Sequence, residues 1–299
     1  MIYTVTPFPT VEYYAKVHSF QQGKLLTPDK TDVFIGGTGV NVSLMLNNLG
    51  YPSMTLGFVS GITGAFIEDF LAQLGCTTGF IKVNGNPADC INMRIDTIKP
   101  TDIIGKGFSV TKNDIELLYG KLDLLSEGDM LIMMGNLPSG FPKDFYEDIL
   151  MTFADRNLKI VSDTDNPSLD KILEKNPFLI RADKKGLEKH FGVELKDHSD
   201  AAWYAGKMCE QGAKNVVVYL GAHGTVIVTS DGKALHSPAP KGNVVSTYGA
   251  KESLAAGFIA GYFDSEGDIM YAFNMGIAAC NATAFSSRIA TAEEVRALM

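Results

Sequence analysis

The chain has 299 residues, which is enough to bury one large core, or one core with a small attached lobe. Its 26 basic and 34 acidic residues give a formal net charge of −8 with no basic block. This balance argues against a nucleic-acid-binding surface, although it is compatible with a local basic site for phosphate.

The cysteines and the lengths of the apolar runs indicate in which cellular compartment the protein is found. The four cysteines are scattered, without a CxxC pair or a Cys/His ligand spacing, so free thiols in a reducing cytosol are expected. The first residues, MIYTVTPFPTVEYYAKV, lack the basic and apolar regions of a signal peptide. No segment reaches the roughly 18 apolar residues of a membrane span. We therefore expect a cytoplasmic protein with neither a membrane nor a nucleic-acid partner.

Short β-rich runs alternate with amphipathic helical patterns along most of the chain. Predicted strands at 53–60, 129–135 and 158–164 precede predicted helices at 64–75, 142–156 and 167–175, and a helix at 200–213 precedes a strand at 215–221. Apolar strands followed by amphipathic helices predict a parallel sheet covered on both faces. In such α/β domains, ligands bind beyond the carboxyl ends of the strands.

Two segments, residues 11–35 and 88–106, interrupt this alternation. Both alternate apolar and polar residues without a helix between their strands, so they predict antiparallel hairpins outside the main sheet. We interpret them as a small lid inserted into one domain that spans residues 1–299.

The segment GGTGVNVSLMLNNLG, residues 36–50, is a glycine turn that leads into a helix. The glycines would let a ligand approach the backbone closely, and Asn41 could hydrogen-bond a sugar hydroxyl. The segment matches neither the Walker pattern nor the full GxGxxG fingerprint. A tight turn without function therefore remains an equal alternative.

Two further segments carry candidate polar groups. In VSDTDNPSL, Asp163 and Asp165 stand where a strand should end, so they could bind Mg²⁺ through water or cap the next helix. In VYLGAHGTVIV, a turn joins two strands, and we expect His223 to be a solvent-facing turn residue rather than a catalyst.

The segment STYGAKESLAAGFIAGY, residues 246–262, is the most informative one. A polar turn with Gly249 leads into an apolar helix, whose first amides and dipole could bind an anion. Glu252, in the first turn, could take a proton from a hydroxyl nucleophile. The alternative is an acidic residue that only stabilises the helix start.

These segments occur in the order found in the PfkB branch of the ribokinase-like carbohydrate kinases. MIYTVTPFPTVEYY is similar to the opening strand and NPA-x-D turn of that family, and GGTGVNVSLMLNNLG resembles its GGKGxN segment. MMGNLPSGFPKDFY resembles SGSLPPG, and the segment 246–262 resembles the DTxGAGD signature. The chain looks especially like the hexose-phosphate members, the 1-phosphofructokinases and tagatose-6-phosphate kinases.

The resemblance implies a three-layer α/β/α ribokinase-like fold with a β-sheet lid, and ATP-dependent phosphoryl transfer to a hydroxyl of a sugar or sugar phosphate. ATP and Mg²⁺ are the implied cofactors, with metal ligands left unassigned. It implies that Glu252 is the base and that Gly249, Ala250 and Lys251 hold the migrating phosphoryl group. It implies a nucleotide site at Asp183, Tyr219, Gly221, Gly224 and Asn281, and a sugar site at Glu12, Gly36, Gly37, Thr38, Asn41, Cys90 and Asn136.

The chain departs from the family pattern in every functional segment. Glu252 stands in place of the signature aspartate, and Lys251 in place of a signature glycine. The GGKG lysine is Thr38, and the lid arginine is matched by Cys90. The sequence is therefore compatible either with a kinase site rebuilt for another acceptor, or with a catalytically weakened protein that binds a sugar or nucleotide.

The loss of two cations predicts the kind of acceptor. Thr38 and Cys90 cannot form the charge-assisted hydrogen bonds that a phosphate on the sugar would need, each worth about 1.5–3 kcal/mol. Arg94 and Lys99 are in the same hairpin and could compensate only if they point inward. We expect an unphosphorylated or differently charged acceptor.

The lid also predicts the assembly. Two hairpins with apolar residues such as Tyr13, Tyr14, Ile91, Met93 and Ile95 are too small to be stable alone in water. We expect them to pack over the sugar site and against the lid of a second copy, which would give a two-fold homodimer.

Overall fold

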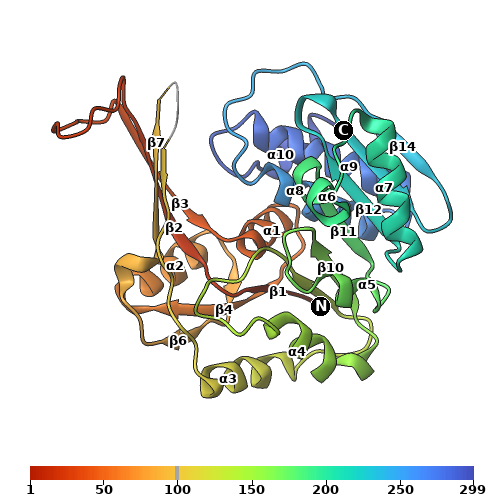
Figure 1. The fold of residues 1–299 in the computed structure, drawn as a ribbon, viewed down its shortest axis with the longest axis horizontal. Helices are drawn as coiled ribbons and strands as arrows, with labels where there is room; N and C mark the ends of the chain where they lie inside the picture. The colour runs from red at the N-terminus through yellow and green to blue at the C-terminus, as the bar shows by residue number, and fades with distance from the viewer. Residues whose placement is uncertain (98–100) are drawn as a thin grey trace.

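The computed structural model of the chain describes residues 1–97 and 101–299. A large sheet with helices on both faces forms the body, and a second, smaller sheet projects from one end of it (Figure 1). This arrangement confirms the predicted three-layer α/β/α fold with a β-sheet lid.

The main sheet is formed by ten strands of the described residues. They are β1 (Ile2–Thr6), β4 (Met54–Ser60), β5 (Thr77–Thr78), β6 (Ile81–Val83), β9 (Met130–Met133), β10 (Lys159–Asp163), β11 (Leu179–Asp183), β12 (Asn215–Tyr219), β13 (Thr225–Thr229) and β14 (Ala234–Ser237). Their order is β14-β13-β12-β11-β10-β9-β1-β4-β5, with β6 beside β4. All neighbours are parallel except β12-β13 and β13-β14. The central strands are buried on both faces, which explains their unbroken apolar runs.

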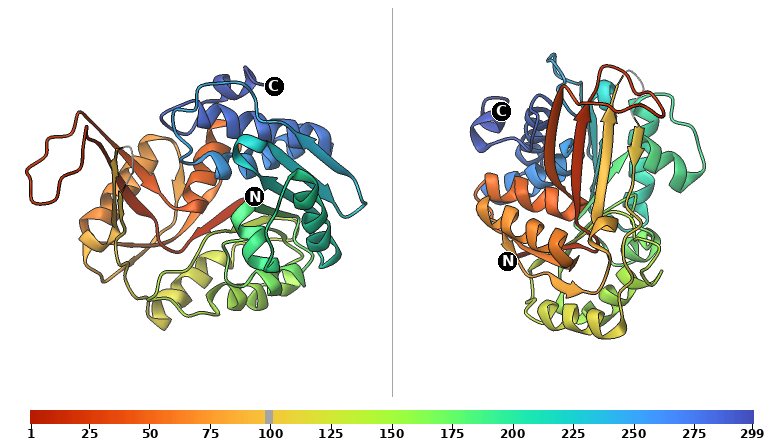
Figure 2. Two further views of the ribbon diagram at one scale, coloured as in Figure 1. Left: turned by 45° about the horizontal axis from the view of Figure 1, so that its top comes forward. Right: turned by 90° about the vertical axis from the view of Figure 1, so that its left-hand side faces the viewer.

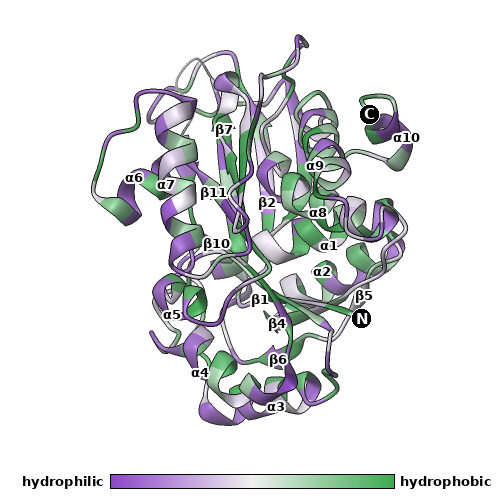
Figure 3. Cartoon of the chain, turned by 90° about the vertical axis from the view of Figure 1, so that its right-hand side faces the viewer, coloured by the Kyte–Doolittle hydropathy of each residue, from purple (hydrophilic) through white to green (hydrophobic). Residues whose placement is uncertain are grey.

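Helices cover both faces of the main sheet. They are α1 (Thr38–Asn48), α2 (Gly61–Gln73), α3 (Lys112–Leu122), α4 (Phe145–Thr152), α5 (Leu169–Leu173), α6 (Lys184–Phe191), α7 (His198–Glu210), α8 (Ala250–Asp264), α9 (Ile269–Ala284) and α10 (Ala292–Arg296). Helices α3 to α7 share one apolar core with the sheet, and α1, α8, α9 and α10 share another (Figure 3). Helix α2 packs beside α1.

Small residues bring α8 and α9 unusually close together. A Cβ added to Gly257 would lie 2.6 Å from the carbonyl oxygen of Met275, and one added to Gly276 would lie 2.8 Å from that of Leu254. Only glycine fits at such positions, because the backbones themselves are in contact. The close packing fixes the amino-terminal end of α8 relative to the sheet.

The second sheet, which we call the lid, contains β2 (Thr10–Lys16), β3 (Lys30–Gly36), β7 (Ile91–Asp96) and β8 (Thr101–Ile103), in the order β3-β2-β7-β8. Pairs β2-β3 and β7-β8 are antiparallel hairpins, and β2-β7 is parallel. Figure 2 shows these strands rising from the body. Side chains alternate between two faces. On β2, Glu12, Tyr14 and Lys16 share the face that lines the cavity described below, which we call the inner face. Val11, Tyr13 and Ala15 belong to the opposite, outer face.

Two composition-based expectations concern membrane spans and disulfides. Within residues 1–97 and 101–299, no helix combines the length and apolar character needed to cross a membrane. Cys76, Cys90, Cys209 and Cys280 are all free thiols.

Candidate active site

The parallel strands end in polar side chains along one edge of the main sheet. Asp163 ends β10, Asp183 ends β11 and Tyr219 ends β12. Strand pairing sets Asp163 opposite Arg181. This edge is where open α/β sheets bind their ligands.

Arg181 is the centre of the charges at this edge. Its guanidinium is 1% exposed, forms an ion pair with Asp163, and lies 3.6 Å from the carboxylate of Asp165. Burial alone would lower the pKa of Arg181, but the negative charges of Asp163, Glu252 and Asp165 raise its pKa overall. Among the described residues, its Nε and Nη1 have no hydrogen-bond partner. Arg181 is therefore a fixed, buried positive charge among three carboxylates.

Sequence reasoning did not single out Arg181. An arginine inside the apolar run NPFLIRAD was itself a signal, because a buried charge requires a partner. Of the two alternatives for Asp163 and Asp165, capping of the next helix is wrong, and Mg²⁺ binding stays a prediction. The residue at the start of α5 is Ser168, whereas Asp163 binds Arg181 and accepts a hydrogen bond from the Gly135 amide at 3.0 Å.

The first turn of α8 presents backbone amides at the same edge. Gly249 precedes the helix with a φ of 73°, and a Cβ there would collide with Ile289, so this turn requires glycine. No side chain of the described residues caps the helix start. The Ala250 amide makes a 3.3 Å hydrogen bond to the carbonyl of Thr247 in the preceding turn. Amides of a first turn have no partner within their helix, so they can bind an anion. Ala250, Lys251 and Glu252 form this turn.

Lys251 bridges the α8 turn to the next strand end. Its Nζ lies 2.7 Å from Oδ2 of Asp183, and both side chains are partly buried. Asp183 also accepts a hydrogen bond from the Gly186 amide at the start of α6. Burial would raise the pKa of Asp183, but these hydrogen bonds and the charge of Lys251 lower its pKa overall. The bridge joins the amino termini of α6 and α8.

The turn between β3 and α1 lies where the sugar site was predicted. Gly36 is in contact with the side chains of Glu12 and Thr10, which leave no room for a Cβ. Gly37 has a φ of 120° and directly precedes α1. The Glu12 carboxylate accepts hydrogen bonds from Thr10 at 2.6 Å and Asn92 at 2.8 Å. The structure thus brings Glu12 and the glycine turn together.

The loop after β9 connects the sugar side to the strand ends. A Cβ on Gly135, which has a φ of 90°, would lie 2.9 Å from Oγ1 of Thr38. Because the Gly135 amide also binds Asp163, Thr38 is held close to the charged edge. Asn136 follows in this loop with an exposed side chain.

Tyr248, which sequence reasoning also missed, lies between the α8 turn and the lid. Its hydroxyl donates to the carbonyl of Ile35 at 3.1 Å and is hydrogen-bonded to Asn41. Its ring stacks on Phe34, with centroids 5.6 Å apart. Burial, followed by the nearby charge of Glu12, raises the pKa of Tyr248 well above its ordinary value.

A cavity of about 630 Å³ separates the lid from the loop before α8. Tyr248 and Ser246 line it from the body, and the inner lid face contributes the cations Lys16, Lys30 and Arg94. The carboxylates of Glu12, Asp32 and Asp96 line it as well. Arg94 thus belongs to the inner face, opposite Tyr14. Lys99, the other cation considered in this hairpin, is outside the described residues.

The assignment of Cys90 to the sugar site is wrong, because its side chain lies in the buried core. Cys90 ends a short 3₁₀-helix, η1 (Pro87–Cys90), and is 1% exposed within the apolar core beside Phe108. Burial raises the pKa of the Cys90 thiol to about 11, so the group is neutral and inert.

The predicted nucleotide residues lie around the carboxyl end of β12. Tyr219 is half-buried, and burial together with nearby Cys280 raises its pKa. Asn281 follows Cys280 in α9. Gly221 begins a 3₁₀-turn, η3 (Gly221–His223), and Gly224, with a φ of 90°, is held against the carbonyl of Ser237. His223 is exposed in this turn. The nucleotide-binding role of these residues stays a prediction.

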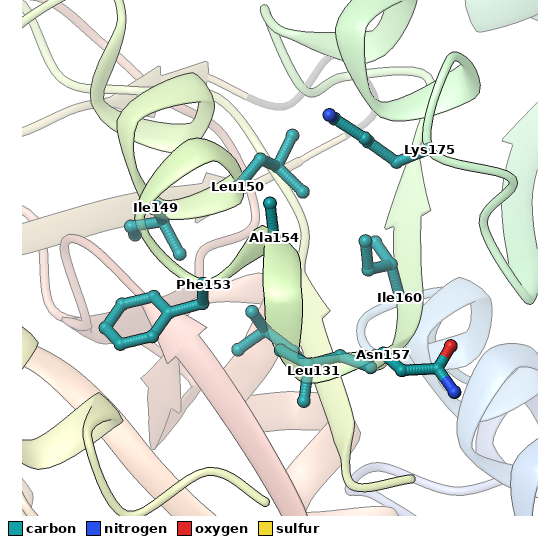
Figure 4. A pocket seen from close by; sticks show the side chains of 9 residues that line it. Leu131, Ile149, Leu150, Phe153, Ala154, Asn157, Ile160 and Lys175 are labelled. Atoms are coloured by element: carbon teal, nitrogen blue, oxygen red, sulfur yellow. The ribbon is translucent and has the colours of Figure 1, made fainter. Parts of the chain in front are cut away.

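A second, smaller cavity of about 120 Å³ lies away from these residues (Figure 4). Leu131, Ile149, Phe153 and Ile160 form its apolar wall, and Lys175 lies at its side. Asn157, two residues before β10, also lines it, so this cavity is at the opposite end of β10 from Asp163.

Three comparisons place the chain among known proteins. Residues 10–294 match the pfkB family carbohydrate kinases. A 1-phosphofructokinase of Bacillus subtilis is 34% identical over 299 residues, which cover 100% of this chain and 97% of that protein. A D-tagatose-1-phosphate kinase of Bacillus licheniformis is 29% identical over 260 residues, covering 87% and 84%. Phosphofructokinase-2 from Escherichia coli, in complex with substrates and products, has the same fold, with a TM-score of 0.91 at 20% identity and coverage of 99% and 97%.

Proposed function

Because the chain belongs to the pfkB family of carbohydrate kinases, we propose that it transfers the γ-phosphoryl group of ATP to a hydroxyl of a sugar phosphate. The single observation that carries this proposal is the uncapped first turn of α8, which presents its amides and Glu252 beside the buried charge of Arg181. In the proposal, residues 1–299 act as one cytoplasmic domain of which the lid is a lobe.

Each part of the α8 turn has a role in the proposed reaction. The acceptor oxygen attacks the γ-phosphorus, the bond to the β-phosphate oxygen of ADP breaks, and the hydroxyl proton passes to Glu252. The amides of Gly249, Ala250 and Lys251 stabilise the charge on the migrating phosphoryl group. Arg181 is buried, so it acts as a positioning residue, through its charge on Glu252 and the carboxylates around it.

The oxygen ligands at the site are compatible with Mg²⁺ carried by the nucleotide. Kinases bind this ion through phosphates, water and one or two carboxylates. Asp163 and Asp183 are engaged by Arg181 and Lys251. Asp165 lies 3.6 Å from Arg181 but is 43% exposed at the sheet edge. We propose that Asp165 holds the waters of the ion, whose charge would neutralise the phosphates.

The acceptor proposal follows the relatives and the lid. Two relatives are named for sugar 1-phosphates, 1-phosphofructokinase and D-tagatose-1-phosphate kinase. Thr38 and Cys90 supply no cation, but Lys16, Lys30 and Arg94 line the cavity. Lys30 pairs with Asp32 at 2.7 Å and Arg94 with Asp102 at 3.4 Å, and we propose that a phosphate ester takes the place of these carboxylates. This set of cations supports a phosphorylated acceptor in place of the unphosphorylated one expected from Thr38 and Cys90 alone.

The test measures ATP·Mg²⁺ binding by calorimetry and ADP release with fructose 1-phosphate. We expect nucleotide binding below millimolar concentration, and fructose 1-phosphate to bind at least tenfold more tightly than fructose, because each charge-assisted hydrogen bond to the ester contributes about 1.5–3 kcal/mol. Arg94→Met should reduce this preference, whereas Lys171→Met, at an exposed ion pair with Glu174, should not. Absence of nucleotide binding at millimolar concentration would contradict kinase function and favour a protein that binds only the sugar.

The outer face of the lid supports a proposed homodimer. Val33, Ile91, Met93 and Ile103 are all at least 36% exposed, although each is a large apolar side chain. Such a surface on one face of a thin sheet is typical of a self-complementary interface. We expect light scattering at tens of micromolar to give the mass of a dimer, and Met93→Glu to give the monomer. A monomeric wild-type chain would contradict the interface.

A further inference from the structure

Tyr248 lines the cavity between the lid and the loop before α8. The side chain is partly buried, in the turn that precedes Gly249. Three contacts hold it: its ring stacks on Phe34, its hydroxyl donates to the Ile35 carbonyl, and it is hydrogen-bonded to Asn41. A six-membered ring therefore occupies the space between the first turn of α8 and the predicted sugar residues.

The side chain of Asn41 indicates which kind of ligand group the Tyr248 ring excludes. Its side chain is 5% exposed, and its amide is engaged by Tyr248. Among the described residues, its Oδ1 has no hydrogen-bond partner. A buried acceptor without a partner is unfavourable, so such a group in a native protein points to a missing donor. A hydroxyl group is a donor of the right kind.

Glu12 supports the same conclusion from the lid side. Thr10 and Asn92 both donate to its Oε1, which fixes the carboxylate against Gly36. Glu12 and Tyr248 both line the lid cavity, and the negative charge of Glu12 is one cause of the raised pKa of Tyr248. Glu12 and Asn41 are thus two polar groups close to the tyrosine side chain.

We infer that Tyr248 selects the acceptor, because its ring closes the space beside Asn41 and Glu12 and must turn away before a sugar hydroxyl can bind there. The inference rests on the proposed function and identifies a specificity-determining residue for it. Tyr248 makes the site smaller than the lid cavity alone would allow. Hexose phosphates must displace the ring, whereas shorter alcohols need only the outer cavity.

The experiment compares Tyr248→Val and Tyr248→Leu, which shorten the side chain, with Tyr248→Phe, which keeps the ring and removes the hydroxyl. Binding of fructose 1-phosphate and D-tagatose 1-phosphate is measured by calorimetry. We expect both shortened variants to bind these esters at least tenfold more tightly than the wild type. Tyr248→Phe should stay within about threefold. In turnover assays the gain should appear as a lower KM, with kcat changed much less.

Two results would overturn the inference. One is equal or weaker binding of the esters by a shortened variant whose thermal melting and ADP binding match the wild type. The other is a gain in Tyr248→Phe as large as in Tyr248→Val, which would assign the effect to the hydroxyl. Because binding is measured without turnover, tighter binding in inactive variants would support the role of Tyr248 while contradicting the proposed kinase reaction.

Discussion

Replacing Glu252 with glutamine is expected to lower kcat by roughly a hundred- to ten-thousandfold, the range for loss of a general base. Glutamine has nearly the same shape but cannot accept the acceptor proton. The nucleotide phosphates bind to amides that the substitution leaves in place, so ATP affinity should change little. Steady-state kinetics and calorimetry on the same preparation measure both quantities.

Glu147→Gln is the matched control for this prediction. Glu147 is also an acidic residue in the first turn of a helix, α4, which is a different helix from α8. If Glu252 acted only through the helix dipole, both substitutions would cost about 0.3–1 kcal/mol of stability and leave kcat unchanged. Equal turnover in Glu252→Gln and the wild type would exclude Glu252 as the base.

Arg181→Met is expected to lower the free energy of unfolding by about 3–5 kcal/mol, because it leaves the carboxylate of Asp163 buried without its cation. Asp163 is fully buried, so water cannot replace the lost partner. The double variant Arg181→Met/Asp163→Asn should recover much of the loss, since no isolated charge remains. Urea denaturation of the three proteins provides the comparison.

Lys207→Met provides the control for Arg181. Lys207 pairs with Glu210 on the exposed face of α7 at 2.8 Å, and exposed pairs contribute only about 0–1 kcal/mol. An Arg181→Met loss as small as that of Lys207→Met would show that the buried pair is solvated or easily replaced.

The sequence predicted the features that depend on local pattern. The alternation of apolar runs and helices gave the main sheet, and the absence of helices in 11–35 and 88–106 gave the lid. The glycine positions at Gly36 and Gly249 could be recognised because a close backbone approach excludes every other residue. These signals need only neighbours along the chain.

The features that were missed depend on contacts between distant segments. The role of Arg181 depends on its contacts with Asp163 and Asp165, which belong to the preceding strand and the loop after it. The role of Tyr248 depends on contacts with Phe34, Ile35 and Asn41, which are more than 200 residues earlier in the chain. Cys90 was assigned as if it belonged to a strand of the lid, but the 3₁₀-turn before β7 directs it into the core. Strand alternation begins only at Ile91 and puts Arg94 on the inner face.

The close packing of α8 on α9 determines which part of the molecule is free to move. At Gly257, Gly261 and Gly276 the two backbones touch, so α8 cannot slide or tilt without collision. The end of α8 that begins at Gly249 is therefore held in a fixed position. We therefore expect any closure that expels water from the reacting groups to come from the lid, which is joined to the body by short connections at residues 6–10 and 36–38.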